Sequence, residues 1–139
     1  MKSVDLVKQE LEDLKDEFSY IETPIDKMNF IIDLGKEGNN NDSIQSNENE
    51  IQGCVSTAYI NIEIEGEELH LSYFADALIV QGFLAIICDT LEETSVHDLN
   101  KNLELIKKFS MDVGLQSFLS PNRSNALFNI FRKIENSVN

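Results

Sequence analysis

The chain has 139 residues, of which 42% are hydrophobic and 26% charged, a composition typical of one globular domain spanning residues 1–139. Its 25 Asp and Glu residues outnumber its 11 Lys and Arg residues, so the formal net charge is −14. This charge argues against nucleic acid and against an anionic membrane surface as partners, because both need clustered cations. A basic patch on another protein would suit it, although an acidic surface that only maintains solubility is the simpler interpretation.

The chain contains two cysteines, Cys54 and Cys88, which are too few for a disulfide framework. The N-terminal stretch resembles neither a signal peptide nor a transit peptide. We therefore expect a reducing compartment and a cytoplasmic location, although a mature organellar protein would look the same. The longest apolar run, residues 75–88, is interrupted by polar residues and is too short to span a bilayer.

Two amphipathic helices are expected before residue 40. Ser3 can cap the first helix, and Thr23 followed by Pro24 marks the start of the second, which Gly35 or Gly38 can end. The apolar stripes that should be buried are Val7, Leu11, Leu14 and Phe18, then Ile25, Met28, Ile31, Ile32 and Leu34. Residues 36–49 are polar and Asn-rich, which predicts an exposed, mobile connection.

The middle of the chain predicts a small antiparallel sheet. Residues 56–64 alternate between apolar and polar positions, Gly66 marks a hairpin turn, and residues 69–73 alternate again. A short strand over residues 50–52 would make the sheet three-stranded. One face should be apolar and covered by helices, with His70 on the wetter face.

Three further helices should follow the sheet. Residues 77–88 are apolar nearly all round, which indicates a central buried helix in which Cys88 packs as a small hydrophobe. Residues 94–113 repeat apolar positions at helical spacing, and Ser120 followed by Pro121 should begin a closing helix. The expected fold class is therefore α+β, a sheet packed by helices from both ends of the chain.

Cys54 is the leading candidate for chemistry, because it follows Gly53 directly at the mouth of a strand. A set of three or four Cys and His residues at metal-binding spacing is absent, and so is a Gly-rich phosphate loop. His70 and His97 are the available imidazole bases for a Cys–His pair, and each is better explained as a surface residue. A thiol that accepts sulfur from another protein needs no base of its own.

Four stretches of the sequence resemble the SufE family of sulfur acceptor proteins. Residues 51–56 (IQGCVS) are similar to the family's Gly-Cys-Gln-Ser signature, and residues 30–36 (FIIDLGK) to its second-helix motif. Residues 74–82 (FADALIVQG) and 119–127 (LSPNRSNAL) resemble two further family motifs in the family order. The resemblance covers nearly the whole chain and implies a SufE/IscU-like fold.

The resemblance implies that Cys54 takes sulfane sulfur from a SufS-like, pyridoxal-phosphate-dependent cysteine desulfurase and relays it to an Fe–S scaffold. It implies a protein that is not itself an enzyme, stimulates the desulfurase, works as a monomer or a homodimer, and holds no cofactor or metal of its own. Asp76 would lie near the cysteine loop and Arg123 would contribute to the desulfurase contact. From the residues alone, Asp76 is equally a helix N-cap, and Arg123 a surface residue in the first turn of the closing helix.

Several positions depart from the family pattern and leave alternatives open. The departures are Val55, Ala58-Tyr59, Phe118, Asn122 and Ala126. They bear on partner specificity and transfer rate more than on the fold. A non-catalytic acidic adaptor of the same fold is the first alternative function, a Cys–His enzyme the second, and a cluster scaffold the third.

Overall fold

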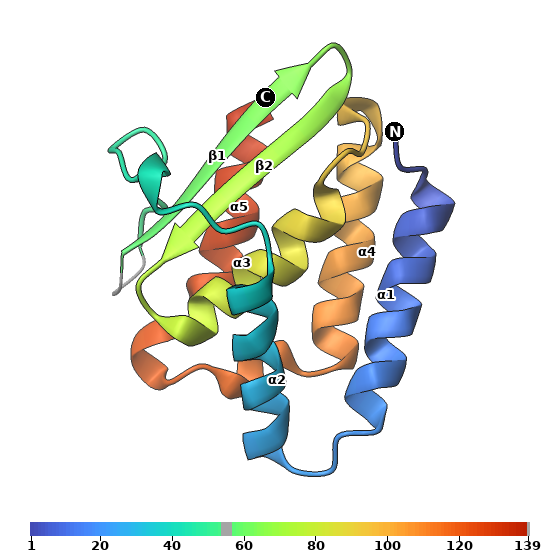
Figure 1. The fold of residues 1–139 in the computed structure, drawn as a ribbon, viewed down its shortest axis with the longest axis vertical. Coiled ribbons are helices and arrows are strands. Elements are labelled where there is room, and N and C mark those ends of the chain that lie inside the picture. The colour runs from blue at the N-terminus through green and yellow to red at the C-terminus, as the bar shows by residue number, and fades with distance from the viewer. Residues whose placement is uncertain (54–56, 139) are drawn as a thin grey trace.

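The computed structural model describes residues 1–53 and 57–138. Within them the regular elements are α1 (Val4–Ser19), α2 (Pro24–Glu37), β1 (Ala58–Glu65), β2 (Glu68–Ala75), α3 (Leu78–Leu91), α4 (Leu99–Asp112) and α5 (Ala126–Val138). Short 3₁₀ turns cover Asp42–Ile44, Val96–Asp98, Leu115–Phe118 and Pro121–Arg123. Figure 1 shows the β1–β2 hairpin lying across α3 and α5, with α1 and α4 side by side farther away. The α+β class is thereby confirmed.

Both N-terminal helices begin at the predicted caps. The Ser3 side chain accepts a hydrogen bond from the Leu6 N–H at 3.1 Å, and the Thr23 hydroxyl accepts one from the Asp26 N–H at 3.1 Å. The predicted stripe of α1 is buried at its first, second and fourth positions and partly buried at Leu14. These local signals suffice because each cap satisfies backbone donors within its own first turn.

The predicted stripe of α2 is wrong in its first half. Ile31 is buried, but Met28 lies at the surface and Ile25 is 71% exposed. Figure 1 shows why: the first turns of α2 extend beyond α3, the helix against which α2 packs. Helical spacing identifies the apolar side of a helix, but it does not determine how much of its length the partner covers.

The hairpin has the predicted alternation and turn. The two strands pair from Ala58 opposite Ala75 to Glu65 opposite Glu68, and Gly66 in the turn has a positive φ of 65°. Alternate residues of β2 are buried from Leu69 to Ala75. The outer end of β1 runs past the helices, so Ile64 is exposed although it continues the apolar side of the strand.

The predicted third strand is not confirmed. Among the described residues the sheet has two strands, and residues 50–52 contribute one isolated bridge, between Glu50 and Tyr59. The Ile51 N–H donates to the Ala58 carbonyl at 2.8 Å, and the pairing stops there because residues 52–53 form a turn in which Gly53 has a φ of 85°. A positive φ is incompatible with continued pairing in an extended strand.

The Asn-rich connection is exposed as predicted, but it is hydrogen-bonded along its length. The Asn41 N–H donates to the Tyr73 carbonyl at 2.8 Å, which ties the segment to β2. The Asn40 amide donates to the Gly35 carbonyl at 2.9 Å, and the Asn49 amide donates to the Ile44 carbonyl at 2.8 Å. Asparagine side chains therefore supply bonds that a regular element would otherwise supply.

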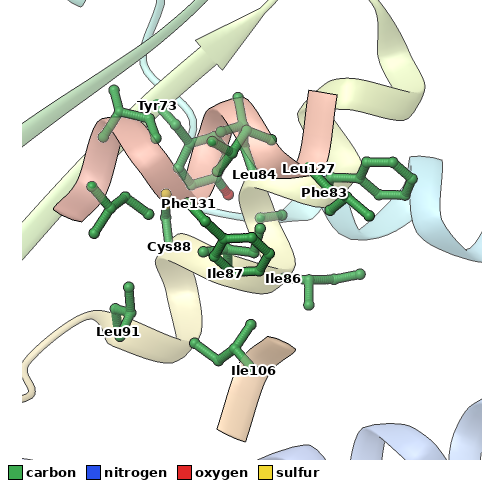
Figure 2. Packing of buried hydrophobic residues seen from close by; sticks show 14 of the residues in the cluster. Tyr73, Phe83, Leu84, Ile86, Ile87, Cys88, Leu91, Ile106, Leu127 and Phe131 are labelled. Carbon is green, nitrogen blue, oxygen red and sulfur yellow. The ribbon is translucent and has the colours of Figure 1, made fainter. Parts of the chain in front are cut away.

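Helix α3 is the central buried helix that the sequence predicts. Cys88 has no exposed surface, and Figure 2 shows it in the cluster that contains Tyr73, Leu84 and Phe131. Burial raises the pKa of the Cys88 thiol well above its ordinary value. Cys88 is thus a packing residue, as predicted.

The C-terminal helices follow their predicted stripes but not every predicted boundary. The buried apolar residues are Leu99, Leu103, Ile106 and Phe109 in α4 and Leu127, Ile130, Phe131 and Ile134 in α5, and Val113, directly after α4, is partly buried. Ser120 and Pro121 begin a 3₁₀ turn instead of the closing helix, and α5 starts at Ala126. The Ser120 side chain makes no capping hydrogen bond.

Two glycines allow α2 and α3 to pack backbone against backbone. A Cβ atom on Gly82 would lie 2.3 Å from the Ile31 carbonyl oxygen, and one on Gly35 would lie 2.7 Å from the Gly82 nitrogen. Both distances are shorter than any real contact of a Cβ atom, and the atoms met are backbone atoms, which cannot rotate away. The crossing therefore depends on the absence of side chains at both positions.

We expect Gly82→Ala to destabilise the fold by about 1–3 kcal/mol, because the added methyl must push α2 away from α3. The free energy of unfolding from urea titration measures this loss. Asn29→Ala, on the exposed face of α2, is the matched control and should be neutral or slightly stabilising. A Gly82→Ala protein as stable as the wild type would show that the helices separate without cost.

Candidate functional site

Cys54, the predicted acceptor, lies outside the described residues together with Val55 and Ser56. The site is therefore built from the residues that flank this segment. On one side Gly53 has the left-handed φ of 85° expected for it, and on the other Thr57 leads directly into β1.

The two flanks of the segment are held together at the base. Ile51 is buried, and its N–H donates to the carbonyl of Ala58, the first residue of β1. Ala58 is buried as well and pairs with Ala75 at the end of β2. The residues on the two sides of positions 54–56 are thus attached to the same edge of the hairpin.

Asp76 is bound to the flank of this segment and not to the helix that follows it. The Thr57 hydroxyl donates to the Asp76 carboxylate at 2.9 Å, and the Asp76 N–H donates to the Thr57 carbonyl at 3.2 Å. The alternative N-cap role is wrong, because Ala77 occupies the cap position of α3 and no side chain caps that helix. The carboxylate is therefore joined to a residue three positions after Cys54.

The sequence analysis did not predict a role for Thr57, although the position of the hairpin turn is enough to pair it with Asp76. A two-residue turn at Gly66 and Glu67 fixes the register of both strands, and counting back from it places Thr57 opposite Asp76.

Asn129 is a second residue that sequence reasoning missed. It lies in α5 and is almost fully buried, and its amide nitrogen would be 2.8 Å from a Cβ atom on Gly53. A side chain at position 53 would therefore displace the Asn129 amide as well as strain the backbone. No sequence pattern relates two residues so far apart in the chain.

Arg123 ends the 3₁₀ turn Pro121–Arg123, ahead of α5, so its expected place in the first turn of the closing helix is wrong. Its Nε atom is buried without a hydrogen-bond partner among the described residues. Within those residues no hydrogen bond or ion pair joins Arg123 to Asp76. The structure thus relates Asp76 to the flank of the cysteine segment and leaves the role of Arg123 open.

Both histidines lie near the turn of the hairpin, away from Thr57. His70 is six residues from Asp76, or about 20 Å along an extended strand. Its Nδ1 atom is 2.8 Å from the Glu92 carboxylate, and that hydrogen bond raises the pKa of His70 above its ordinary value. His97 is exposed, with Nε2 3.2 Å from the carboxylate of Glu67 in the turn. Both contacts are those of surface residues, as expected, and neither histidine lies beside the flanks of the cysteine segment.

Across residues 1–53 and 57–138, no three His, Cys, Asp or Glu side chains are grouped so that they could hold a metal ion. None of the helices in that part of the chain combines the length and the apolar character that crossing a bilayer requires.

Comparison with known proteins gives one consistent result. The family model for SufE, described as an Fe-S metabolism associated domain, matches residues 12–138. A SufE-like protein of Synechocystis is 32% identical over 87 residues, which is 63% of this chain and 53% of that protein. SufE-like protein 1, chloroplastic/mitochondrial, of Arabidopsis thaliana is 25% identical over 138 residues, covering 97% of this chain and 36% of that protein.

A SufE-like protein of Rhizobium meliloti is similar along its whole length, with 25% identity over 133 residues, 92% of this chain and 94% of that protein. This chain thus spans 53% of the Synechocystis relative and 36% of the Arabidopsis relative.

The raised pKa of His70 predicts a specific dependence of stability on pH. The protonated ring stabilises the fold fully below its unfolded pKa of about 6.5, and this contribution is lost as the pH rises through the raised folded pKa. An NMR titration should show His70 titrating above the ordinary value, and Glu92→Gln should return it toward that value. An unchanged His70 pKa in the Glu92→Gln protein would contradict the assignment.

Proposed function

The chain belongs to the SufE family, and from that membership we propose that it accepts sulfane sulfur on Cys54 from a pyridoxal-phosphate-dependent cysteine desulfurase. It then relays the sulfur to an Fe–S cluster scaffold, and it stimulates the desulfurase by emptying the desulfurase cysteine. In this proposal the pyridoxal phosphate belongs to the partner, and the chain performs half of a transfer without a cofactor of its own.

The transfer is an exchange at sulfur. The Cys54 thiolate, having lost its proton to solvent or to the partner's site, attacks the outer sulfur of the desulfurase persulfide. A new S–S bond forms on Cys54, the S–S bond of the desulfurase breaks, and the desulfurase cysteine leaves as a thiolate. Such an exchange depends on the thiolate fraction and on access to the attacking sulfur.

The observation that carries the proposal is the state of the other thiol. Cys88 has no exposed surface and a pKa raised by burial, so it is neither accessible nor ionised at neutral pH. Among the two cysteines of the chain, this leaves Cys54 as the acceptor. Two features of the flanks favour this role for Cys54. Gly53, directly before it, has a left-handed φ, and the hydrogen bond from the Ile51 N–H to the Ala58 carbonyl holds the two flanks together.

Asp76 and Arg123 are assigned secondary roles. Through its hydrogen bonds with Thr57, Asp76 steadies the flank of the segment and influences the position that Cys54 takes. Arg123 contributes to the desulfurase contact, because a guanidinium can form paired hydrogen bonds with a partner carboxylate.

The first test is whether the protein gains sulfur. After incubation with a cysteine desulfurase and free cysteine, intact-mass spectrometry should show the added mass of a sulfur atom, and peptide mapping should locate it on Cys54. Cys54→Ser should abolish both the added mass and the stimulation of the desulfurase.

Cys88→Ser is the matched control and should still gain sulfur. Sulfur gained equally well by Cys54→Ser would contradict the proposal. A Cys54→Ser protein that gains no sulfur but still stimulates the desulfurase fully would indicate the non-catalytic adaptor instead.

A second test addresses the bond between Thr57 and Asp76. Thr57→Val removes the side-chain hydrogen bond but keeps the Asp76 charge, and we expect it to speed alkylation of Cys54. A lost hydrogen bond of about 1 kcal/mol corresponds to roughly a fivefold effect. Iodoacetamide labelling rates followed by mass spectrometry measure the change.

Asp76→Asn separates charge from attachment, because an amide oxygen can still accept from the Thr57 hydroxyl. If attachment governs reactivity, this variant should react more like the wild type than Thr57→Val does. Labelling rates that are the same in all three proteins would remove Asp76 from the site.

A further inference from the structure

The charges of this chain are unevenly divided along its length. Residues 99–139, which include α4 and α5, carry six of the 11 basic residues and three of the 25 acidic ones, a net charge of +3. The preceding 98 residues therefore carry −17. The C-terminal helices thus form a locally basic region of an acidic protein.

An apolar groove of about 830 Å³ runs between α4 and α5 in this basic region. Leu127 and Phe131 form its floor and are nearly buried, whereas Met111 and Phe128 project from the two helices and are 76% and 64% exposed. Large apolar side chains on both sides of a groove are costly to leave in water.

The two cationic side chains of the groove lie over its aromatic rings. The Arg132 guanidinium lies 5.5 Å from the centre of the Phe128 ring, and Lys107 lies 5.5 Å from that of Phe131. Lys107 is paired with Glu135 at 2.8 Å, but within the described residues no carboxylate pairs with Arg132. The neighbouring Lys133 donates to a backbone carbonyl, that of Glu48.

We propose that this groove binds an amphipathic, acidic helix of a partner protein. The apolar face of such a helix would cover Met111 and Phe128, and a carboxylate at its edge would pair with Arg132. Both the apolar and the acidic character of the partner helix follow from the groove, because a purely apolar segment would leave Arg132 without a carboxylate. Recognition of a helix in an apolar groove between two helices is a recurring mode of binding.

The charge distribution supports an acidic occupant over a second copy of this chain. An adjoining groove beside α4 is lined by four lysines (Lys8, Lys101, Lys107 and Lys108) and two carboxylates (Asp5 and Glu104), so an excess of positive charge extends past the site itself. Two copies meeting at this face would bring like charges together. An acidic helix would instead be attracted to it from a distance.

The groove reaches toward the flank of the cysteine segment. Arg132 also lines a shallow pocket with Asn129 and with Gln52, two residues before Cys54. The Arg132 side chain therefore connects the groove with a pocket at the flank of the cysteine segment. The inference does not depend on the proposed sulfur transfer, because it rests on α4 and α5 alone.

The test uses a fluorescein-labelled helical peptide with Leu at every third or fourth position and Glu on both flanks. Anisotropy with the full chain should show binding that weakens as salt is raised above about 0.1 M, where surface charges are screened. Replacing all Glu by Lys should weaken it by about tenfold or more. Phe128→Ser and Arg132→Glu should each weaken it about tenfold, as expected for central contacts.

Ile25→Ser and Lys27→Glu are matched controls on α2, at an exposed apolar residue and a basic residue outside the groove. They should leave the affinity unchanged, and circular dichroism verifies that every variant is folded. The inference is overturned if the acidic peptide does not bind, if the Lys peptide binds equally well, or if the α2 variants weaken binding as much as the groove variants. It is also overturned if sedimentation shows a dimer that Phe128→Ser dissociates.

Discussion

The contact between α2 and α3 at Gly35 and Gly82 is the constraint on which the rest of the structure depends. With no side chains between them, the backbones are close enough for the buried Gln81 amide to donate to the Gly35 carbonyl at 3.2 Å. The same amide accepts from the Ala75 N–H at 3.2 Å. One side chain thereby joins the end of β2 to two helices, and a buried amide satisfied on both sides strongly favours a single arrangement.

This junction connects the core to the candidate site. Ala75 is the last residue of β2, Asp76 follows it, and Thr57 lies across from Asp76 because the turn fixes the register. The register sets the pairing of Thr57 with Asp76, and the Gln81 hydrogen bonds hold the neighbouring end of β2 against α2 and α3. The flank of the cysteine segment is thereby attached to the packed core, and rigid scaffolds of this kind position reactive side chains.

Much of this fold could be predicted from the sequence. The features that could not be predicted share one cause, which is that they depend on contacts between distant parts of the chain. The caps at Ser3 and Thr23, the alternation of β2 and the burial of α3 depend on residues near one another in the chain. The exposed half of α2, the absent third strand and the contact of Asn129 with Gly53 depend on where distant elements end relative to one another. For the candidate site, the motif predicted Cys54 and Asp76, but only the register of the hairpin gives Asp76 its partner.

The net charge of the chain illustrates the same distinction between composition and arrangement. A total of −14 describes the average surface and argues against polyanions that need many cations at once. It does not describe α4 and α5, where the local excess is positive and where exposed apolar side chains accompany the cations. A basic partner surface and an acidic helix could therefore bind the same molecule together, because the charges that attract them lie on different elements. Partner choice depends on local potential, and the sum over the chain mainly determines solubility.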